Sequence, residues 1–248
     1  MAFSLYSAVP MPQISWKKEN MKLTMAFFHL VGVLIFAFTI FFYFIAKRFS
    51  LSPFLFSLIL VLGSFFITGG IHKDGFMDSC DGFFSRKERE EALKIMSDSA
   101  SGAFAVLGAI LLVLTSLVSV SEIFESGKFV LSFGRVFVFS RLFSGYGDLT
   151  IPKAKKDGML FSITEEKEKE KLSLSIIKIV FLFWAFLALL SEPFGAIIVL
   201  SCFFLSYFFF KKKIMLRFGG ITGDLAGFFL EFSQALSFLA LAVFGEVF

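Results

Sequence analysis

The stretch MAFFHLVGVLIFAFTIFFYFIA, residues 25–46, decides the fold class of this chain. It contains no Asp, Glu, Lys or Arg, and it matches the roughly 20 apolar residues that a helix needs to cross the hydrocarbon core of a bilayer. The whole chain has the same character, since 57% of its 248 residues are hydrophobic and 18% are charged. Soluble domains are about 45–50% apolar and about 25% charged. The sequence therefore predicts an integral membrane protein and excludes a soluble globular domain.

Further apolar blocks follow this one, and together they predict an all-α polytopic membrane protein with about seven transmembrane helices. The expected spans are residues 25–46, 51–71, 101–120, 127–147, 172–190, 194–210 and 228–247. Lys and Arg gather in alternate connecting segments, and such residues mark the cytoplasmic side. We therefore expect a cytoplasmic N-terminus, an external C-terminus and a multi-pass protein of the cell membrane (the inner, or cytoplasmic, membrane).

In this topology the polar segments lie almost entirely on one side of the membrane. We treat residues 1–248 as a single integral-membrane domain. Its cytoplasmic parts are the N-terminal segment 1–24, an acidic motif at 72–100, a charged and partly basic loop at 148–171, and a polar stretch at 211–224. Because these segments share one side, we expect a single active site at the cytoplasmic surface.

The most informative polar segment reads TGGIHKDGFMDSCDG, residues 68–82. Its aspartates, Asp74, Asp78 and Asp81, are spaced i, i+4 and i+7, which places them on one face of a helix. Such a stripe either simply faces solvent or binds a divalent cation, which would remove the repulsion between the carboxylates. We favour Mg²⁺, because it takes one or two carboxylates together with substrate phosphates. With two Cys and two His, the chain is poor in ligands for softer metals.

Other ionisable residues on the same side are also candidates for the site. Asp98 precedes the third expected span, where it either caps the helix or joins the acidic group. Asp224 and Glu231 share a helix face, and an ionisable residue inside a span, such as Glu231, is a functional candidate. His72 either contacts substrate or makes a structural hydrogen bond.

Basic side chains supply the complementary charge. Arg141 lies near the cytoplasmic end of the fourth expected span, and its planar guanidinium suits phosphate oxygens. Lys153 and Lys155 stand in the loop PKAKKDG, residues 152–158, which suits anionic lipid and an anionic substrate equally well. Carboxylates for a metal together with Arg and Lys for phosphate charge are the groups that phosphoryl transfer uses. Membrane placement then implies an amphipathic or lipid-borne substrate, or a membrane-bound pathway.

Several of these segments resemble the cobalamin synthase (adenosylcobinamide-GDP ribazoletransferase) family. They are TGGIHKDGFMDSCDG at 68–82, ALKIMSDSASGAFAVLGA at 92–109, PKAKKDG at 152–158 and RFGGITGDLAGFFLEFS at 217–233. The resemblance implies a Mg²⁺-dependent transfer in which α-ribazole, or its 5′-phosphate, displaces GMP from adenosylcobinamide-GDP. The product it implies is adenosylcobalamin or its 5′-phosphate, formed in the last steps of nucleotide-loop assembly.

The resemblance also implies which residues form the site. The acidic motif of the family falls on Asp74, Asp78 and Asp81, and its next motif falls on Asp98 and Ser99. The Gly-Gly-x-Thr-Gly-Asp motif of the family falls on Gly219, Gly220, Thr222, Gly223 and Asp224. The chain departs from the expected pattern at Ser97, where we expect a lysine, and at His29, where we expect a proline.

Two other interpretations are weaker. A CDP-alcohol phosphatidyltransferase also uses clustered aspartates at the cytoplasmic surface, but its motif begins Asp-x-x-Asp and continues to Ala-Arg. Here the first spacing is Asp74-x-x-x-Asp78, and no Ala-Arg follows Asp81. A transporter places ionisable groups near the bilayer midplane, whereas most acidic groups here lie at one surface. The expected partners are the two substrates and the lipid bilayer, with no nucleic acid, and a homo-oligomer or corrinoid-pathway enzymes stay open as further partners.

Overall fold

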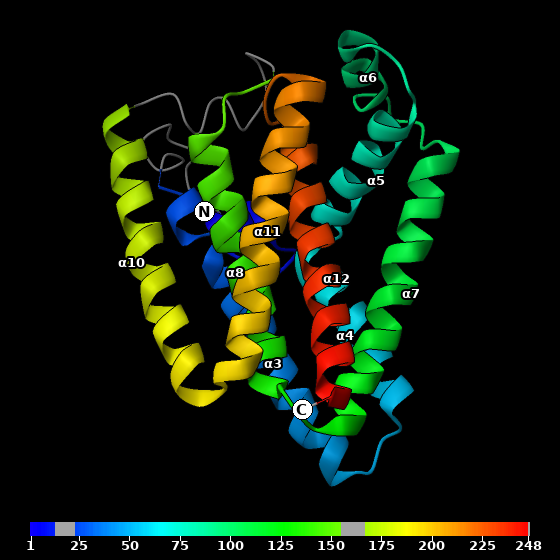
Figure 1. The fold of residues 1–248 in the computed structure, drawn as a ribbon, viewed down its shortest axis with the longest axis vertical. Helices are drawn as coiled ribbons and strands as arrows, with labels where there is room; N and C mark the ends of the chain where they lie inside the picture. The colour runs from blue at the N-terminus through cyan, green and yellow to red at the C-terminus, as the bar shows by residue number, and fades with distance from the viewer. Residues whose placement is uncertain (13–22, 155–166, 248) are drawn as a thin grey trace.

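The computed structural model describes residues 1–12, 23–154 and 167–247, and within these ranges the chain is helical. Its only other regular feature in those ranges is an isolated parallel bridge between Lys153 and Ile221. The helices are α1 (Ala2–Tyr6), η1 (Met25–Phe27), α3 (His29–Arg48), α4 (Pro53–Thr68), α5 (Ile71–Phe84), α6 (Arg89–Ile95), α7 (Ala103–Ser126), α8 (Val130–Thr150), α10 (Lys167–Ser191), α11 (Pro193–Phe218) and α12 (Gly223–Val247). Figure 1 shows the long helices running roughly side by side, with α5 and α6 at the upper end and the C-terminus at the lower end.

Five helices are long and apolar enough to cross a bilayer: α3 with the η1 turn before it, α7, α10, α11 and α12. The shorter helices α4 and α5 pass the same test only as a pair, and they meet at a bend of 94°. The described residues thus hold five candidate spans, or six if the bent pair counts as one, where the sequence predicted about seven. Large apolar side chains such as Leu182, Phe209 and Leu216 point outward from these helices, as lipid-facing side chains do.

The observed and expected numbers of spans differ because of α8, which overlaps the expected span 127–147. Its 21 residues include Arg135, Arg141 and Asp148, and it is not among the candidate spans found in the described residues. Almost all of α8 is nevertheless buried, because α3, α10, α11 and α12 pack around it. The surrounding helices therefore cover the charges of α8, which is how ionisable residues are accommodated inside membrane proteins.

Glycines allow the close packing of α5 against α12. A Cβ atom added at Gly75 would lie 2.9 Å from the Cα atom of Asp224, and one at Gly227 would lie 3.0 Å from the carbonyl oxygen of His72. Contacts this short leave no room for a side chain, so the two helix backbones cross in direct contact. The crossing brings the first turn of α12 beside the first turn of α5.

The turns before these two helices have similar sequences, and each begins with a left-handed glycine. Gly69 and Gly70, between α4 and α5, have φ of 63° and 75°, and Gly219, after α11, has φ of 70°. These left-handed conformations favour glycine, and they end one helix so that the next can begin in a new direction. Each following helix carries an aspartate in its first turn, Asp74 in α5 and Asp224 in α12.

Candidate active site

A cavity of about 180 Å³ lies where the first turns of α5 and α12 meet the last turns of α8. Three carboxylates line it, those of Asp74, Asp148 and Asp224. Two helices begin at its wall, so the positive ends of their dipoles favour an anion there. The cavity therefore combines oxygen ligands for a cation with a setting that suits phosphate.

The aspartates of α5 and α12 form a repulsive group. Asp78 lies within electrostatic range of Asp74, Asp224 and Asp81, all of which carry the same charge. Asp74 is exposed, and Asp78 and Asp224 are half-buried. In the described part of the chain, no group of three or more Asp, Glu, His or Cys side chains is arranged so that it could hold a metal ion. The donor chemistry nevertheless fits Mg²⁺, which completes its shell with water and substrate phosphate around one or two carboxylates.

Asp148 is a cavity residue that the sequence analysis did not include among the site residues. It is 4% exposed, and its Oδ1 atom has no hydrogen-bond partner within the described residues. Its backbone oxygen accepts a hydrogen bond from Nζ of Lys153. The available signal was its position, because Asp148 directly follows the expected span 127–147 and begins the charged loop 148–171.

The groups around Asp148 have altered proton affinities. Burial, and then the negative charge of Asp148, raise the pKa of Tyr6 well above its usual range. Burial lowers the pKa of Lys153, and the charges of Asp148 and Glu170 act in the opposite direction. Tyr6 lines the same cavity, where its protonated hydroxyl donates a hydrogen bond of 3.8 Å to Sδ of Met25.

Asp81 makes a different contact from the other two aspartates of the stripe. Its Oδ2 atom accepts a hydrogen bond of 2.6 Å from the backbone N of Gly102, and its Oδ1 atom accepts one of 2.9 Å from that of Ala105. Asp81 thereby caps the N-terminus of α7. Capping of this helix end was one of the two roles expected for Asp98. Asp98 is exposed, and it accepts a hydrogen bond from the backbone N of Ala100.

His72, Arg141 and Glu231 lie inside the protein. The His72 ring stacks on Tyr6 and also lines the cavity, while its buried Nε2 atom has no partner in the described structure. Arg141 is 2% exposed and donates a hydrogen bond of 2.9 Å from Nη1 to the carbonyl oxygen of Phe137. Neither Arg141 nor Glu231 is among the residues that line the cavity.

Glu231 forms an ion pair with a residue next to Asp74. Its Oε2 atom lies 3.2 Å from Nζ of Lys73, and the Glu231 side chain is 8% exposed. This pair joins α12 to α5 beside the cavity. The structure thus gives Glu231 a partner within the protein, whereas its predicted role in ligand binding stays a prediction.

The glycines of the 219–224 motif are in different environments. A Cβ atom at Gly219 would lie 2.5 Å from the guanidinium of Arg89, and one at Gly220 would lie 2.3 Å from the carbonyl oxygen of Pro152. Packing against backbone requires glycine at Gly220, whereas the Arg89 side chain could move and Gly219 is favoured by its φ of 70°. Gly223 has nothing within 4 Å of an added Cβ atom, and it lines the cavity.

Two further predicted residues flank these glycines. Thr222 accepts a hydrogen bond from the backbone N of Leu225 at the start of α12, so it contributes to the helix end. The backbone of Lys153 pairs with that of Ile221, which fastens the loop after α8 to this motif. Lys155 lies outside the described residues.

The comparison with protein families agrees with the resemblance seen in the sequence. The family model of cobalamin-5-phosphate synthase (CobS) matches residues 1–242. The chain belongs to this family. The fold and the cavity described above are therefore those of a member of the CobS family.

Curated relatives in the family cover nearly the same length. The chain is 31% identical over 245 residues to an adenosylcobinamide-GDP ribazoletransferase of Lachnoclostridium phytofermentans, which covers 98% of this chain and 92% of the relative. It is 30% identical over 249 residues to the enzyme of that name from Clostridium botulinum strain Alaska E43, with 98% and 96% covered. A relative from Geobacillus sp. is 33% identical over 225 residues, with 88% and 84% covered. No solved structure matches the chain significantly.

Proposed function

We propose that this protein is an adenosylcobinamide-GDP ribazoletransferase, which joins α-ribazole or its 5′-phosphate to adenosylcobinamide-GDP and releases GMP. The single observation that carries the proposal is the convergence of Asp74, Asp148 and Asp224 on one cavity at two helix N-termini, in a full-length member of this family. A reaction at phosphorus needs a site for the charged diphosphate, and this cavity supplies one.

In the proposed reaction, the ribazole hydroxyl oxygen forms a bond to phosphorus while the phosphoanhydride bond to GMP breaks. Mg²⁺, when bound, would neutralise the charge that develops on the phosphate oxygens. One or two of Asp74, Asp78 and Asp224 are the proposed ligands at any time, and water and substrate phosphate would complete the shell. Asp81, the third ligand predicted from the stripe, has both oxygens engaged with α7, so it would have to share its remaining lone pairs.

The hydroxyl proton must pass to a base when the new bond forms. Asp148 is our proposed acceptor, because it lines the cavity and its Oδ1 atom has no hydrogen-bond partner among the described residues. The Tyr6 phenol and the N-terminal N–H groups of α5 and α12 would orient the phosphate groups. GMP then leaves with the oxygen that had bridged the two phosphates.

The proposed topology places this cavity at the cytoplasmic surface of the inner membrane. In this topology the bent pair α4 and α5 counts as one span, which gives six candidate spans. Helix α8, covered by its neighbours, is the seventh. An odd number of crossings puts the N-terminus inside and the C-terminus outside, as the Lys and Arg distribution favours.

A turnover assay with purified protein in detergent or nanodiscs tests the proposed function. Adenosylcobinamide-GDP, α-ribazole and Mg²⁺ are supplied, and cobalamin and GMP are followed together. We expect equal amounts of both products, and loss of both on addition of a chelator or in the Asp78→Asn variant. Glu122→Gln is the matched control, because it removes one exposed carboxylate from α7. Absence of product from folded protein at saturating substrate and Mg²⁺ would refute the substrate assignment.

A further inference from the structure

A second hollow, larger than the active-site cavity, lies on the opposite side of α8. It is a groove of about 530 Å³ between α8, α10 and α11. Its floor consists of aromatic rings in mutual contact, such as Phe143 and Phe204, whose centroids are 5.1 Å apart. The groove opens between two candidate membrane spans, α10 and α11, so its mouth faces the bilayer.

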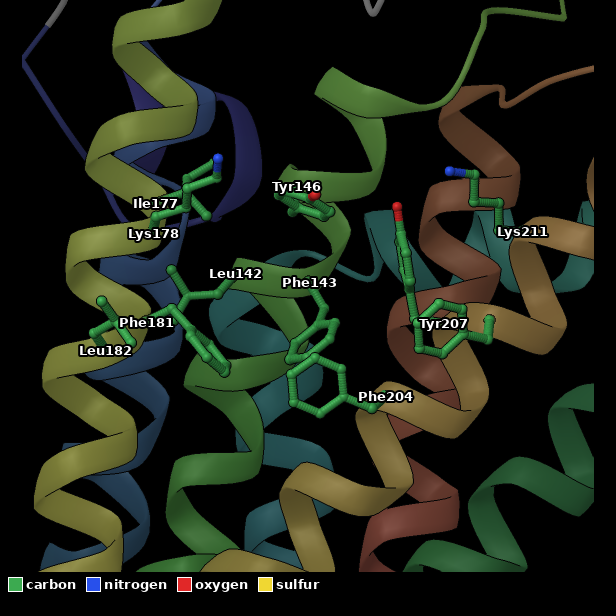
Figure 2. Close-up of a pocket in the computed structure, with 11 residues that line it drawn as sticks. Leu142, Phe143, Tyr146, Ile177, Lys178, Phe181, Leu182, Phe204, Tyr207 and Lys211 are labelled. Carbon is green, nitrogen blue, oxygen red and sulfur yellow. The ribbon is translucent and has the colours of Figure 1, made fainter.

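Cationic and phenolic groups gather at one end of this groove. Figure 2 shows the nitrogen atoms of Lys178 and Lys211 and the hydroxyl groups of Tyr146 and Tyr207 toward the upper rim, above the rings of the floor. No carboxylate lines the groove, and neither lysine has an ion-pair partner among the described residues. A lysine inside a membrane span is costly unless an anion or the interface receives its charge.

We propose that this groove binds one anionic glycerophospholipid, with an acyl chain on the aromatic floor and the phosphate at the rim that carries Lys178 and Lys211. The apolar floor of the groove suits an acyl chain, and the positive charges of its two lysines suit an anionic headgroup. A neutral lipid would satisfy the floor and leave the lysines without a net counter-charge.

The groove shares α8 with the active-site cavity. Leu142, Phe143 and Tyr146 face the groove, whereas Ser144 and Asp148 line the cavity on the other side of the same helix. A lipid bound in the groove therefore packs directly against the helix that carries Asp148. The lipid site is independent of the proposed reaction, and its test does not require turnover.

Photo-crosslinking measures occupancy of the groove directly. The full chain is placed in phosphatidylcholine nanodiscs that contain a trace of phosphatidylglycerol with a diazirine on its acyl chain, and labelled peptides are mapped by mass spectrometry. We expect labelling of α10 and α11 at the groove, with competition by unlabelled phosphatidylglycerol and much weaker competition by phosphatidylcholine. Equal competition by the two lipids, or labelling only outside the groove, would overturn the proposal.

Matched variants separate the headgroup contact from the acyl-chain contact. Lys178→Gln/Lys211→Gln should raise the concentration of phosphatidylglycerol needed for half-maximal labelling by about thirtyfold if each lysine contributes as lysines near anionic lipid usually do. Lys94→Gln/Lys171→Gln removes two exposed lysines outside the groove and should change it less than twofold. Leu182→Trp keeps the charge and narrows the groove at an exposed lining position, so it should weaken labelling without removing either lysine. Unchanged labelling in the first variant would refute the headgroup site.

Discussion

Three aspartates on α5 lie within two helical turns of each other and meet different surroundings. Asp74 faces the cavity, Asp78 is half-buried among other carboxylates, and Asp81 is turned toward α7. The i, i+4, i+7 spacing predicts that the three aspartates share a helix face. A neighbouring helix can still contact only one of them, as α7 contacts Asp81. The identity of that neighbour depends on tertiary packing, and so the cap made by Asp81 could not be found from spacing.

Removal of the Asp81 cap should destabilise the protein. Asp81→Ala deletes the acceptor of two backbone N–H groups at the start of α7, and we expect a loss of roughly 2 kcal/mol. Asp98→Ala serves as the control, because that side chain is exposed, and it should stay within about 0.5 kcal/mol of the parent. Unfolding in mixed micelles measures both changes. Equal destabilisation by the two variants would argue against capping by Asp81.

Asp148 should be needed for the chemical step. If it accepts the hydroxyl proton, Asp148→Asn lowers kcat by about 100-fold to 10,000-fold while KM for adenosylcobinamide-GDP changes little. Steady-state kinetics on folded protein measures the two parameters separately. A parent-like kcat would remove Asp148 from the mechanism and leave the metal ligands unaffected.

The sequence predicted the positions of individual helices more completely than it predicted the contacts between them. Apolar runs at 25–46, 101–120, 172–190, 194–210 and 228–247 each fall on a helix that is long and apolar enough to span a membrane. The run at 51–71 falls on α4 and ends at the Gly69–Gly70 turn, where the chain bends sharply into α5. The run at 127–147 corresponds to α8, which is buried by its neighbours. Hydropathy alone does not reveal that other helices surround this one.

The contact between α5 and α12 should not tolerate a methyl group. Gly75→Ala would place a Cβ atom against the backbone of Asp224, and we expect a loss of about 1–3 kcal/mol of stability. Gly223→Ala is the control within α12, because an added Cβ atom there meets nothing within 4 Å. Unfolding of the two variants under identical conditions tests this. A neutral Gly75→Ala would mean that the helices can separate without cost.

The ion pair between α5 and α12 should behave as a buried pair. Lys73→Met leaves the Glu231 carboxylate with Arg141 as its remaining cationic neighbour, and we expect a loss of about 1–3 kcal/mol. The double variant Lys73→Met/Glu231→Met removes both charges and should be the more stable of the two. A double-mutant cycle on unfolding gives the coupling energy, and strictly additive losses would show that the two residues act independently.

At the scale of the whole molecule, the polar segments that are distant in sequence meet at one end of the bundle. The first turns of α5 and α12 and the last turns of α8 surround one cavity. The side of the membrane on which this cavity lies stays a prediction. The sequence could indicate a shared side because charge distribution reports orientation. It could not indicate that Asp148 joins Asp74 while Glu231 pairs with Lys73, since those contacts depend on how the helices rotate about their axes.

Reporter fusions test the topology of the whole chain. With the proposed odd number of crossings, alkaline phosphatase fused after Phe248 should be active, and green fluorescent protein at the same place should be dark. Green fluorescent protein fused before Met1 should fluoresce, which controls for expression of the chain. A fluorescent C-terminal fusion would require an even number of spans and would contradict the proposed arrangement.

The covered position of α8 also affects how the protein is made. A membrane insertase tests each segment as it leaves the ribosome, and an arginine at the centre of a helix costs about 2.5–3.5 kcal/mol at that moment. Arg135 and Arg141 reach the insertase before α10, α11 and α12 have been synthesised, although those helices later enclose them. We therefore expect stable partition of α8 to depend on the helices that follow it in the chain. A nascent chain released before Gly223 would leave α8 without its last cover and become a substrate for membrane quality-control proteases.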